Sequence, residues 1–373
     1  MASHVLDEYC PSISSPPGET LDELLSEAGM TQVDLAARVG LSPKTVNGII
    51  HGTEPIAPRT ALALESVFGL SAGFWIRLES AYRESQARQA RDMELRDCTE
   101  WLEQFPWREA VKLGWFPKGS SDAQTVSNLL CFMGVCSPRA FDDAYAWVRN
   151  SLVVSFRRSV SFRSDPQAVA LWLRQGEIQA RSIDGAPFSA DGLRGCLQRA
   201  RTLTLESGPG AFLPKLSDAC AQCGVAVVFV PEVGKTRVSG AARWLAPSKA
   251  IVQLSLRHQT NDHLWFAFFH ECMHLLHHSR RRTFVDIEGD GGECEDEADK
   301  RASDLLIPAP QLRRWLAEGR PTKTRVSAFA HAIGVAPGII VGRLQHDGTI
   351  GFREMNDLKC RYSWANASPR AHG

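Results

Sequence analysis

The pattern of hydrophobic and polar positions changes along the chain, and each change predicts a different kind of element. Residues 1–16 are rich in serine and proline, which predicts a disordered N-terminus. Residues 17–85 hold short amphipathic segments with tight connections, which predict a small all-α domain. Residues 86–207 keep a helical periodicity without a recognisable chemical motif, so we expect a helical connecting region there.

Residues 208–373 have a different pattern. The segments "VAVVFVPEV" and "AIVQLSLR" are rich in β-branched residues and predict strands. The apolar stretch "WFAFFHECMHLLHHS", from Trp265 to Ser279, follows them and predicts a buried helix. We therefore expect an α+β domain in which the strands precede this helix.

Length and composition set the class of protein. A chain of 373 residues exceeds what one hydrophobic core usually supports, so we expect a multidomain protein. The 42 basic residues balance the 42 acidic ones, which argues against binding of a polyanion by the whole chain. Neither a secretory signal nor an apolar stretch long enough to span a bilayer is evident, so we expect a cytoplasmic protein with no membrane partner.

The ten cysteines are scattered, which indicates reduced thiols and not a disulfide framework. Cys220 and Cys223 have CxxC spacing, but no second pair completes a zinc site. We expect two ordinary buried thiols at these positions.

The predicted buried helix carries four histidines and a glutamate, although polar groups are costly to bury unless something binds them. His270, Glu271 and His274 form an HExxH pattern, and on a helix the two histidines lie one turn apart on one face, able to bind the same ion. Glu271 is offset to the side, where a carboxylate can accept a proton from an activated water. The alternative is a buried helix whose histidines only form hydrogen bonds.

A catalytic zinc site usually needs a third protein ligand. The extended pattern HExxHxxGxxH is excluded, because His277 and Arg280 stand where it requires glycine and histidine. The following stretch "ECEDEADKRASDLLIP" places Glu295 and Asp299 on one face of a predicted helix. Glu295 would then reach the metal, while Asp299 would hydrogen-bond a ligand histidine.

Other residues compete for these roles. Glu293 and Glu297 are alternatives to Glu295, although acidic runs are usually solvated faces. His277, two turns after His270, is an alternative ligand or a neighbour of the ligands. A different metal is also conceivable, since part of the region has the spacing of an EF-hand calcium loop, with Asp286, Glu288, Asp290, Gly291 and Glu297 at positions 1, 3, 5, 6 and 12. Calcium would leave the histidine pair unexplained.

The motifs "HECMHLLHH" and "ECEDEADKRASDLLIP" together resemble the ImmA/IrrE family of bacterial metallopeptidases, whose patterns are HELGH and ExEADxFAxxLLxP. The resemblance implies a zincin-like fold, with the zinc ligands and the general base at the positions already singled out, namely His270, His274, Glu295 and Glu271. His278 matches a histidine that often trails the first motif in the family. Met273 stands where the family usually has glycine or alanine, and Arg301 replaces a phenylalanine.

The N-terminal stretch "MTQVDLAARVGLSPKTVNGIIHG" has the spacing of a helix-turn-helix, with Thr31 capping the first helix and Ser42 capping the second. With the following "TEPIAPRTALALESVFGLSAGFWIRLESAY" it resembles the HigA-like antitoxin branch of the Cro/repressor (XRE-type) family. The predicted DNA-binding residues are Gln32, Ser42, Lys44, Thr45 and Asn47.

Charge complicates this prediction. From residue 17 to residue 60 the segment holds three basic residues against six acidic ones. Because DNA affinity depends heavily on phosphate neutralisation, the segment is poor for binding as a monomer. A homodimer would present two recognition helices at once, whereas a domain kept only for protein contacts is the alternative.

Together these observations predict a helix-turn-helix domain, a helical connecting region and an α+β zincin-like metallopeptidase domain. The resemblance implies a zinc-dependent regulatory endopeptidase that binds operator DNA and cleaves another protein, such as a repressor or an antitoxin or toxin partner. The alternative is a HigA-like antitoxin or transcriptional regulator whose peptidase domain is a non-catalytic sensor or partner-binding module. Met273 favours the second hypothesis, and the intact ligand set favours the first.

Overall fold

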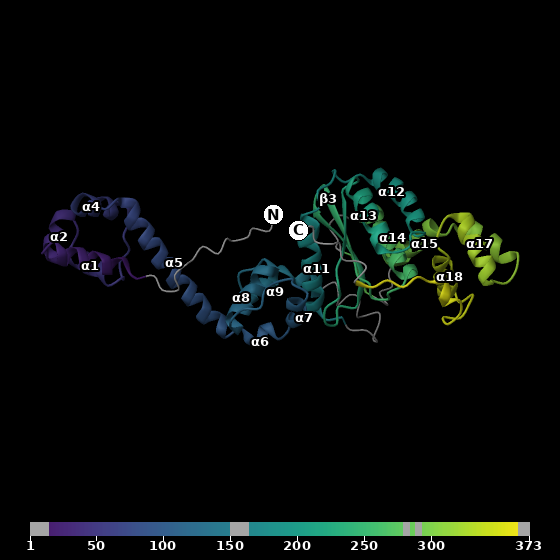
Figure 1. Cartoon of the computed structure of the whole chain (residues 1–373), viewed down its shortest axis with the longest axis horizontal. Helices are drawn as coiled ribbons and strands as arrows, with labels where there is room; N and C mark the ends of the chain where they lie inside the picture. The colour runs from purple at the N-terminus through teal and green to yellow at the C-terminus, as the bar shows by residue number, and fades with distance from the viewer. Residues whose placement is uncertain (1–14, 150–163, 279–283, 288–292, 365–373) are drawn as a thin grey trace. The chain divides into compact units, whose positions relative to one another are not determined.

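The computed structural model describes residues 15–149, 164–278, 284–287 and 293–364 of the chain (Figure 1). The described part is mostly helical and contains one small mixed sheet, which agrees with the multidomain, helix-rich architecture predicted from the sequence. All but the last two residues of the predicted disordered N-terminus lie outside the described residues. The chain divides into two compact units, Met1–Thr99 with Gly119–Val126, and Glu100–Lys118 with Ser127–Gly373.

The N-terminal unit contains a cluster of short helices, as the amphipathic pattern predicted. They are α1 (Pro17–Glu27), α2 (Gln32–Val39), α3 (Pro43–Ile50), α4 (Pro58–Phe68) and the longer α5 (Ala72–Arg96). Their apolar faces meet in one core, whose largest fully buried side chains are Leu21, Leu35, Leu64 and Trp75.

Local hydrogen bonds fix the start of α2 and the turn between α2 and α3, and the sequence predicted the caps at Thr31 and Ser42. The Thr31 hydroxyl accepts a hydrogen bond from the Asp34 backbone N–H at 3.2 Å, and the Asp34 carboxylate accepts one from the Thr31 backbone N–H at 3.1 Å. Ser42 caps α3 in the same way, by accepting from the Thr45 backbone N–H at 3.1 Å. Gly40 ends α2 in the left-handed region, with φ of 69°, where glycine carries no steric penalty. Both predicted caps are confirmed.

The predicted boundary between residues 85 and 86 falls inside a helix. After Gly73, α5 contains neither glycine nor proline, so nothing in its sequence interrupts it. Ion pairs at helical spacing support its middle, with Glu79 to Arg83 at 2.7 Å and Glu84 to Arg88 at 2.5 Å. The change of texture near residue 85 therefore marks a loss of burial, not the end of an element.

The second unit is built on a four-stranded sheet with the strand order β1-β3-β2-β4. Its strands are β1 (Val225–Phe229), β2 (Val238–Ala246), β3 (Lys249–Leu254) and β4 (Phe284–Ile287). β1 runs parallel to β3, whereas β2 runs antiparallel to β3 and β4. The sequence predicted β1 and β3. It gave no signal for β2, because small residues from Ser239 to Ala242 stand there in place of β-branched ones.

Helices cover both faces of this sheet, as the surroundings of β3 in Figure 1 show. Val252 and Leu254 belong to the core that includes α14 (Asn261–His277). The intervening Gln253 faces α11 (Pro166–Arg181), and its side-chain amide donates to the Trp172 carbonyl at 2.6 Å. Because side chains alternate along a strand, β3 presents apolar residues to α14 on one face of the sheet and a polar residue to α11 on the other.

The helical connecting region predicted for residues 86–207 is not a separate layer. Trp172 of α11 donates its indole N–H to the Val230 carbonyl at 3.0 Å. Leu193 and Leu197 of α12 (Ala190–Leu203) are fully buried in the core that also contains α14. The expected boundary at residue 208 therefore divides a single core, because these apolar side chains have no other place to be buried.

The remaining elements of the second unit surround this core or lie beside it. Two of them, α15 and α18, pack directly on α14. The remaining elements of the second unit are α7 (Trp107–Lys112), α9 (Pro138–Ala144), α13 (Pro209–Ala221), α15 (Glu293–Leu306), α16 (Ala309–Ala317), α17 (Lys323–Ile333), α18 (Pro337–His346) and the 3₁₀ turn η1 (Asn356–Leu358). Two further helices, α6 (Thr99–Leu102) and α8 (Asp122–Met133), begin at residues of the N-terminal unit and end in the second unit. Among the described residues, no individual helix has both the length and the apolar character needed to cross a membrane; α17 and α18 pass that test only as a pair bent by 113°.

We expect Thr31→Ala to destabilise the N-terminal unit by about 1 kcal/mol, because it removes an N-cap and half of a capping box. Hydrogen exchange of peptides from residues 21–75 of the full-length protein measures this loss as faster exchange. Ser66→Ala is the control, since among the described residues the Ser66 hydroxyl bonds only to the Leu62 carbonyl of the same helix. Equal effects of the two substitutions would contradict the capping role.

Candidate metal centre and nucleic-acid interface

α14 has apolar residues over most of its circumference, so most of it lies in the interior of the second unit. It packs on β2 and β3 and on the helices α12, α15 and α18. Trp265, Phe268 and Phe269 anchor it in the core with exposures of 1% or less. Its polar residues His270 and Glu271 are therefore buried as well, at 3% and 0% exposure. Groups of this kind are stable in such a place only when other groups bind them.

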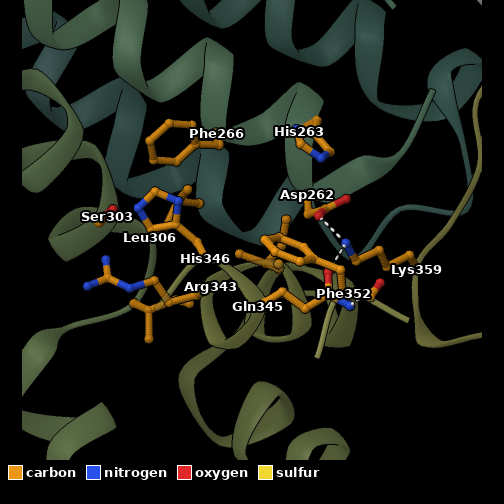
Figure 2. A pocket seen from close by; sticks show the side chains of 13 residues that line it. Asp262, His263, Phe266, Ser303, Leu306, Arg343, Gln345, His346, Phe352 and Lys359 are labelled. Atoms are coloured by element: carbon orange, nitrogen blue, oxygen red, sulfur yellow. Dashed lines mark hydrogen bonds and ion pairs between the residues drawn. The ribbon is translucent and has the colours of Figure 1, made fainter. Parts of the chain in front are cut away.

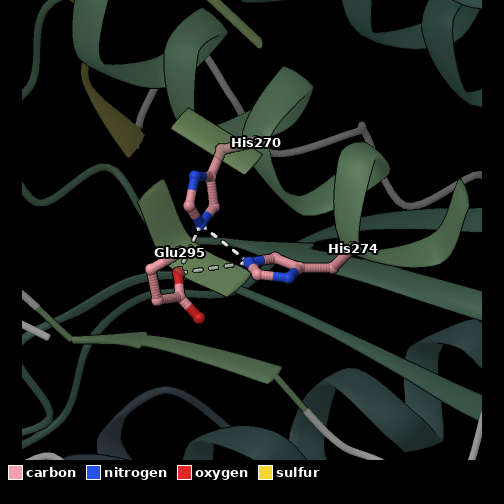
Figure 3. A group of neighbouring side chains, drawn as sticks. All are labelled: His270, His274 and Glu295. Carbon is pink, nitrogen blue, oxygen red and sulfur yellow. Dashed lines mark hydrogen bonds and ion pairs between the residues drawn. The ribbon is translucent and has the colours of Figure 1, made fainter. Parts of the chain in front are cut away.

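Three side chains converge at this point, as Figure 3 shows. The Nε2 atoms of His270 and His274 lie 2.9 Å apart. Oε2 of Glu295, on α15, lies 3.0 Å from Nε2 of His270 and 3.2 Å from Nε2 of His274. The three donor atoms are close enough to bind one ion at the usual zinc distances of about 2.0–2.2 Å. The structure thus brings together the three residues predicted as ligands.

Two further residues hydrogen-bond the Nδ1 atoms of His270 and His274, which point away from the cluster. Asp299, one turn after Glu295 on α15, has its Oδ1 2.7 Å from Nδ1 of His270. The Nδ1 atoms of His274 and His278 lie 2.9 Å apart, so one of the two rings donates and the other accepts. Fixing Nδ1 in this way orients each ring and leaves Nε2 pointing into the cluster. Asp299 therefore contacts a candidate ligand histidine as the sequence predicted, and His278 lies beside the other one.

The protonation states of the cluster suit metal binding. Burial raises the pKa of Glu295, but hydrogen bonds from His270 and His274 outweigh it and bring this pKa down to about 2. Burial lowers the pKa of His274. At neutral pH the site therefore offers a carboxylate and a neutral imidazole, the forms in which these side chains bind metal ions.

Glu271 lies against the sheet, where β2 has a glycine. A Cβ atom on Gly240 would come within 2.7 Å of Oε1 of Glu271, so any larger residue would displace the carboxylate. The pairing of β2 with β4 is irregular between Val238 and Gly240. Sequence reasoning did not single out Gly240, although an isolated glycine inside a strand is a known sign of close approach by another group.

The competing candidates lie elsewhere. Glu297 is exposed and pairs with Arg301 at 2.7 Å. His277 is exposed at the end of α14 and does not belong to the three-residue cluster. Met273 is 4% exposed within the core, so its bulk is accommodated by packing. Of the calcium alternative, Asp286 lies in β4 and Glu297 in α15, while Glu288, Asp290 and Gly291 lie outside the described residues.

The CxxC cysteines are buried thiols, as the sequence predicted. The Sγ atom of Cys220 lies 3.6 Å from Sγ of Cys196 on α12, and the Cys223 thiol donates to the Cys220 carbonyl at 3.1 Å. A hydrogen bond with Cys196, together with burial, raises the pKa of the Cys220 thiol well above its usual value. A buried thiol with a raised pKa is a poor nucleophile, so Cys220 contributes mainly to packing.

On the N-terminal unit, the predicted DNA-binding residues cluster around α3. Lys44 and Asn47 are exposed, and Thr45 is half-buried. The Asn47 side-chain amide donates to Oε1 of Gln32 at 3.2 Å, which joins the start of α2 to the middle of α3. The Ser42 hydroxyl lies 2.9 Å from the Thr45 hydroxyl and also caps α3, so its oxygen already has local partners.

Comparison with known proteins identifies the N-terminal part of the chain. A helix-turn-helix family model matches residues 21–75. The uncharacterized HTH-type transcriptional regulator YddM of Escherichia coli (strain K12) is 26% identical over 77 residues, which are 21% of this chain and 82% of that protein. Virulence-associated protein I of Dichelobacter nodosus is 35% identical over 74 residues, which are 20% of this chain and 68% of that protein.

Among solved structures, the chain is similar to the Pseudomonas aeruginosa antitoxin HigA with the higBA promoter. The two are 34% identical, and the match covers 22% of this chain and 89% of that one with a TM-score of 0.21.

We expect Gly240→Ala to lower the free energy of unfolding by about 1–3 kcal/mol, because the added methyl group overpacks the contact with Glu271. Chemical denaturation of the full-length protein, followed by a spectroscopic signal from the second unit, measures this free energy. Gly210→Ala is the matched control, since nothing lies within 4 Å of its added Cβ. A Gly240→Ala protein as stable as the control would show that Glu271 does not lie against β2.

Proposed function

Because the N-terminal domain of this chain belongs to the helix-turn-helix family, we propose that the protein is a DNA-binding transcriptional regulator with a zinc-dependent peptidase domain. The observation that carries the enzymatic half is the buried convergence of two imidazoles and one carboxylate at an HExxH motif. The resemblance of the two motifs on α14 and α15 to the ImmA/IrrE family supports the same assignment. The ions and macromolecules that each half binds are part of this proposal.

DNA binding is supported by the family match and by the E. coli relative, which is named as a transcriptional regulator. The hydrogen bond between Gln32 and Asn47 orients both amides, so Asn47 can present a donor and an acceptor to a base edge in the major groove. Lys44 lies on the same exposed side of α3 and suits a phosphate. Since acidic residues outnumber basic ones here, we propose that a homodimer binds a two-part operator.

The donor set of the buried cluster fits zinc. Two imidazole nitrogens and one carboxylate oxygen are a usual ligand set for catalytic zinc, and calcium or magnesium would prefer oxygen ligands. We propose His270, His274 and Glu295 as the ligands. When bound, the ion would supply a Lewis acid that makes a water molecule nucleophilic at neutral pH.

The other residues of the site would then serve peptide hydrolysis. Asp299 and His278 keep the ligand rings in one orientation through their Nδ1 atoms. Glu271 would act as the general base, by accepting a proton on its carboxylate and passing it to the leaving amine. On the ImmA/IrrE resemblance, the substrate is another protein, such as a repressor or an antitoxin or toxin partner.

In a second candidate function, the protein has the same fold but does not hydrolyse peptides. In it the protein is a HigA-like antitoxin or regulator, and the domain around α14 senses a ligand or binds a partner. Met273 favours this hypothesis, because it stands where the resembled family has a small residue. Glu271→Gln distinguishes the two, since it removes the general base and leaves the proposed zinc ligands and the DNA-binding domain untouched.

We expect near-stoichiometric zinc in the reconstituted protein, and a 10-fold to 100-fold or greater loss of zinc affinity, as an order of magnitude, in His270→Ala and Glu295→Ala. Elemental analysis after dialysis measures this. The matched controls are His277→Ala and Glu297→Ala, which remove an exposed histidine of α14 and an exposed acid of α15. Absence of zinc, or equal losses in ligand and control variants, would refute the three-ligand site.

For the DNA-binding half, we expect Asn47→Ala to weaken binding to a selected operator by about 1–3 kcal/mol and to relax its sequence specificity. Lys44→Ala should weaken binding to all sequences alike and reduce the salt slope by about 1. Fluorescence anisotropy with oligonucleotides selected from a random pool measures both effects. Arg91→Ala on the exposed part of α5 is the charge-matched control. Unchanged affinity in the α3 variants would indicate a domain that binds proteins only.

A further inference from the structure

A cavity of about 250 Å³ lies near the metal centre, at the other end of the contact between α14 and α15 (Figure 2). On α14, Phe266 lines the cavity one turn before His270, and the two rings are 6.0 Å apart. On α15, Ser303 lines it one turn after Asp299. α18 and the segment after it form the remaining wall. None of the three candidate metal ligands lines this cavity, so it is a separate site.

The body of the cavity is apolar. Phe266, Leu306, Ile307 and Ile339 contribute hydrophobic wall, and Phe352 stands at the edge with 78% of its surface exposed. A cavity of about 150 Å³ with such walls is large enough for benzene, and pockets for drug-sized ligands begin at about 300 Å³. The volume therefore fits a small molecule with an apolar part of roughly eight carbons. A ligand that covers the exposed ring of Phe352 would gain binding free energy from that apolar contact.

One end of the cavity is closed by a polar pair that is already satisfied. Nζ of Lys359 lies 2.6 Å from Oδ2 of Asp262, and both side chains are at least nine-tenths buried. Lys359 also donates to Oε1 of Gln345 at 2.7 Å. The Gln345 amide in turn donates to the Glu354 carbonyl at 2.9 Å, which ties the segment after α18 to the wall. This end needs no further charge from a ligand.

The opposite end offers hydrogen-bond donors. Figure 2 shows Arg343 and His346 on the side of Ser303 and Leu306, across Phe352 from the Asp262–Lys359 pair. Arg343 forms an ion pair with Asp347, to whose carboxylate its Nε donates at 2.7 Å. Within the parts of the chain that the structure describes, its two Nη groups and the His346 ring have no hydrogen-bond partner. A guanidinium fork of this kind is the usual partner of a carboxylate.

We propose that this cavity binds a small amphipathic carboxylate, with its chain against Phe266 and Phe352 and its carboxylate at Arg343. The ligand would contact the two helices that carry the candidate metal ligands. The inference rests only on the cavity and holds whether or not the metal site is catalytic.

The test is calorimetric titration of the full-length protein with octanoate, and with octylammonium and octan-1-ol as probes of the same length and different charge. We expect saturable binding of one octanoate, and weaker binding of the other two probes. Arg343→Gln should weaken octanoate binding about tenfold or more, as expected for the loss of a charge-assisted hydrogen bond. Ser303→Phe should abolish it by filling the cavity from a half-buried position.

Two controls keep the result interpretable. Arg314→Gln removes an exposed arginine of α16 that does not line the cavity, and it should leave octanoate binding unchanged. Thermal unfolding establishes that each variant is folded. If Ser303→Phe does not fold, Arg343→Gln alone is sufficient to test the proposal. The proposal is overturned if octanoate does not bind saturably, if octylammonium binds as tightly, or if folded Arg343→Gln binds octanoate as the native protein does.

Discussion

The structure of the second unit depends on the burial of α14. Most of the surface of α14 is apolar and has to be covered, and the sheet, α12, α15 and α18 provide most of that cover. The same burial removes His270, His274 and Glu271 from water, so the cost of their desolvation has to be met by neighbouring groups. α15 meets part of that cost through Glu295 and Asp299. A candidate metal centre therefore arises where an obligatory packing contact coincides with a set of mutually compatible donors.

Close approach of the polar residues of α14 requires small neighbours, and glycines lie at three such places. Gly338 and Gly342, one turn apart on α18, lie against Asn261 and Asp262, and Gly240 of β2 lies against Glu271. In each case a Cβ atom would come within 2.7 Å of a side-chain oxygen. These glycines let α14 pack closely while its amide and carboxylate groups still find room.

The two units of the chain are stabilised by different kinds of contact. The N-terminal unit is small, and its helices are set by local hydrogen bonds at Thr31, Ser42 and Gly40 together with one compact core. The second unit joins segments far apart in the chain, such as α11 with β3 and α14 with α15, so its site depends on long-range packing. The proposed DNA recognition therefore depends mainly on short-range order, whereas the proposed metal binding depends on long-range packing.

The sequence by itself determined the features that depend on local spacing. The caps of α2 and α3, the strands β1 and β3, the histidine pair on α14, and the shared face of Glu295 and Asp299 on α15 all follow from residue types a few positions apart. Only the tertiary structure decided what depends on distant partners. It placed α11 and α12 on the sheet, formed β2 from small residues, set Gly240 against Glu271, and enclosed the cavity beside Phe266. Periodicity specifies which face of an element is apolar, whereas the segment that covers this face is selected by packing across the whole chain.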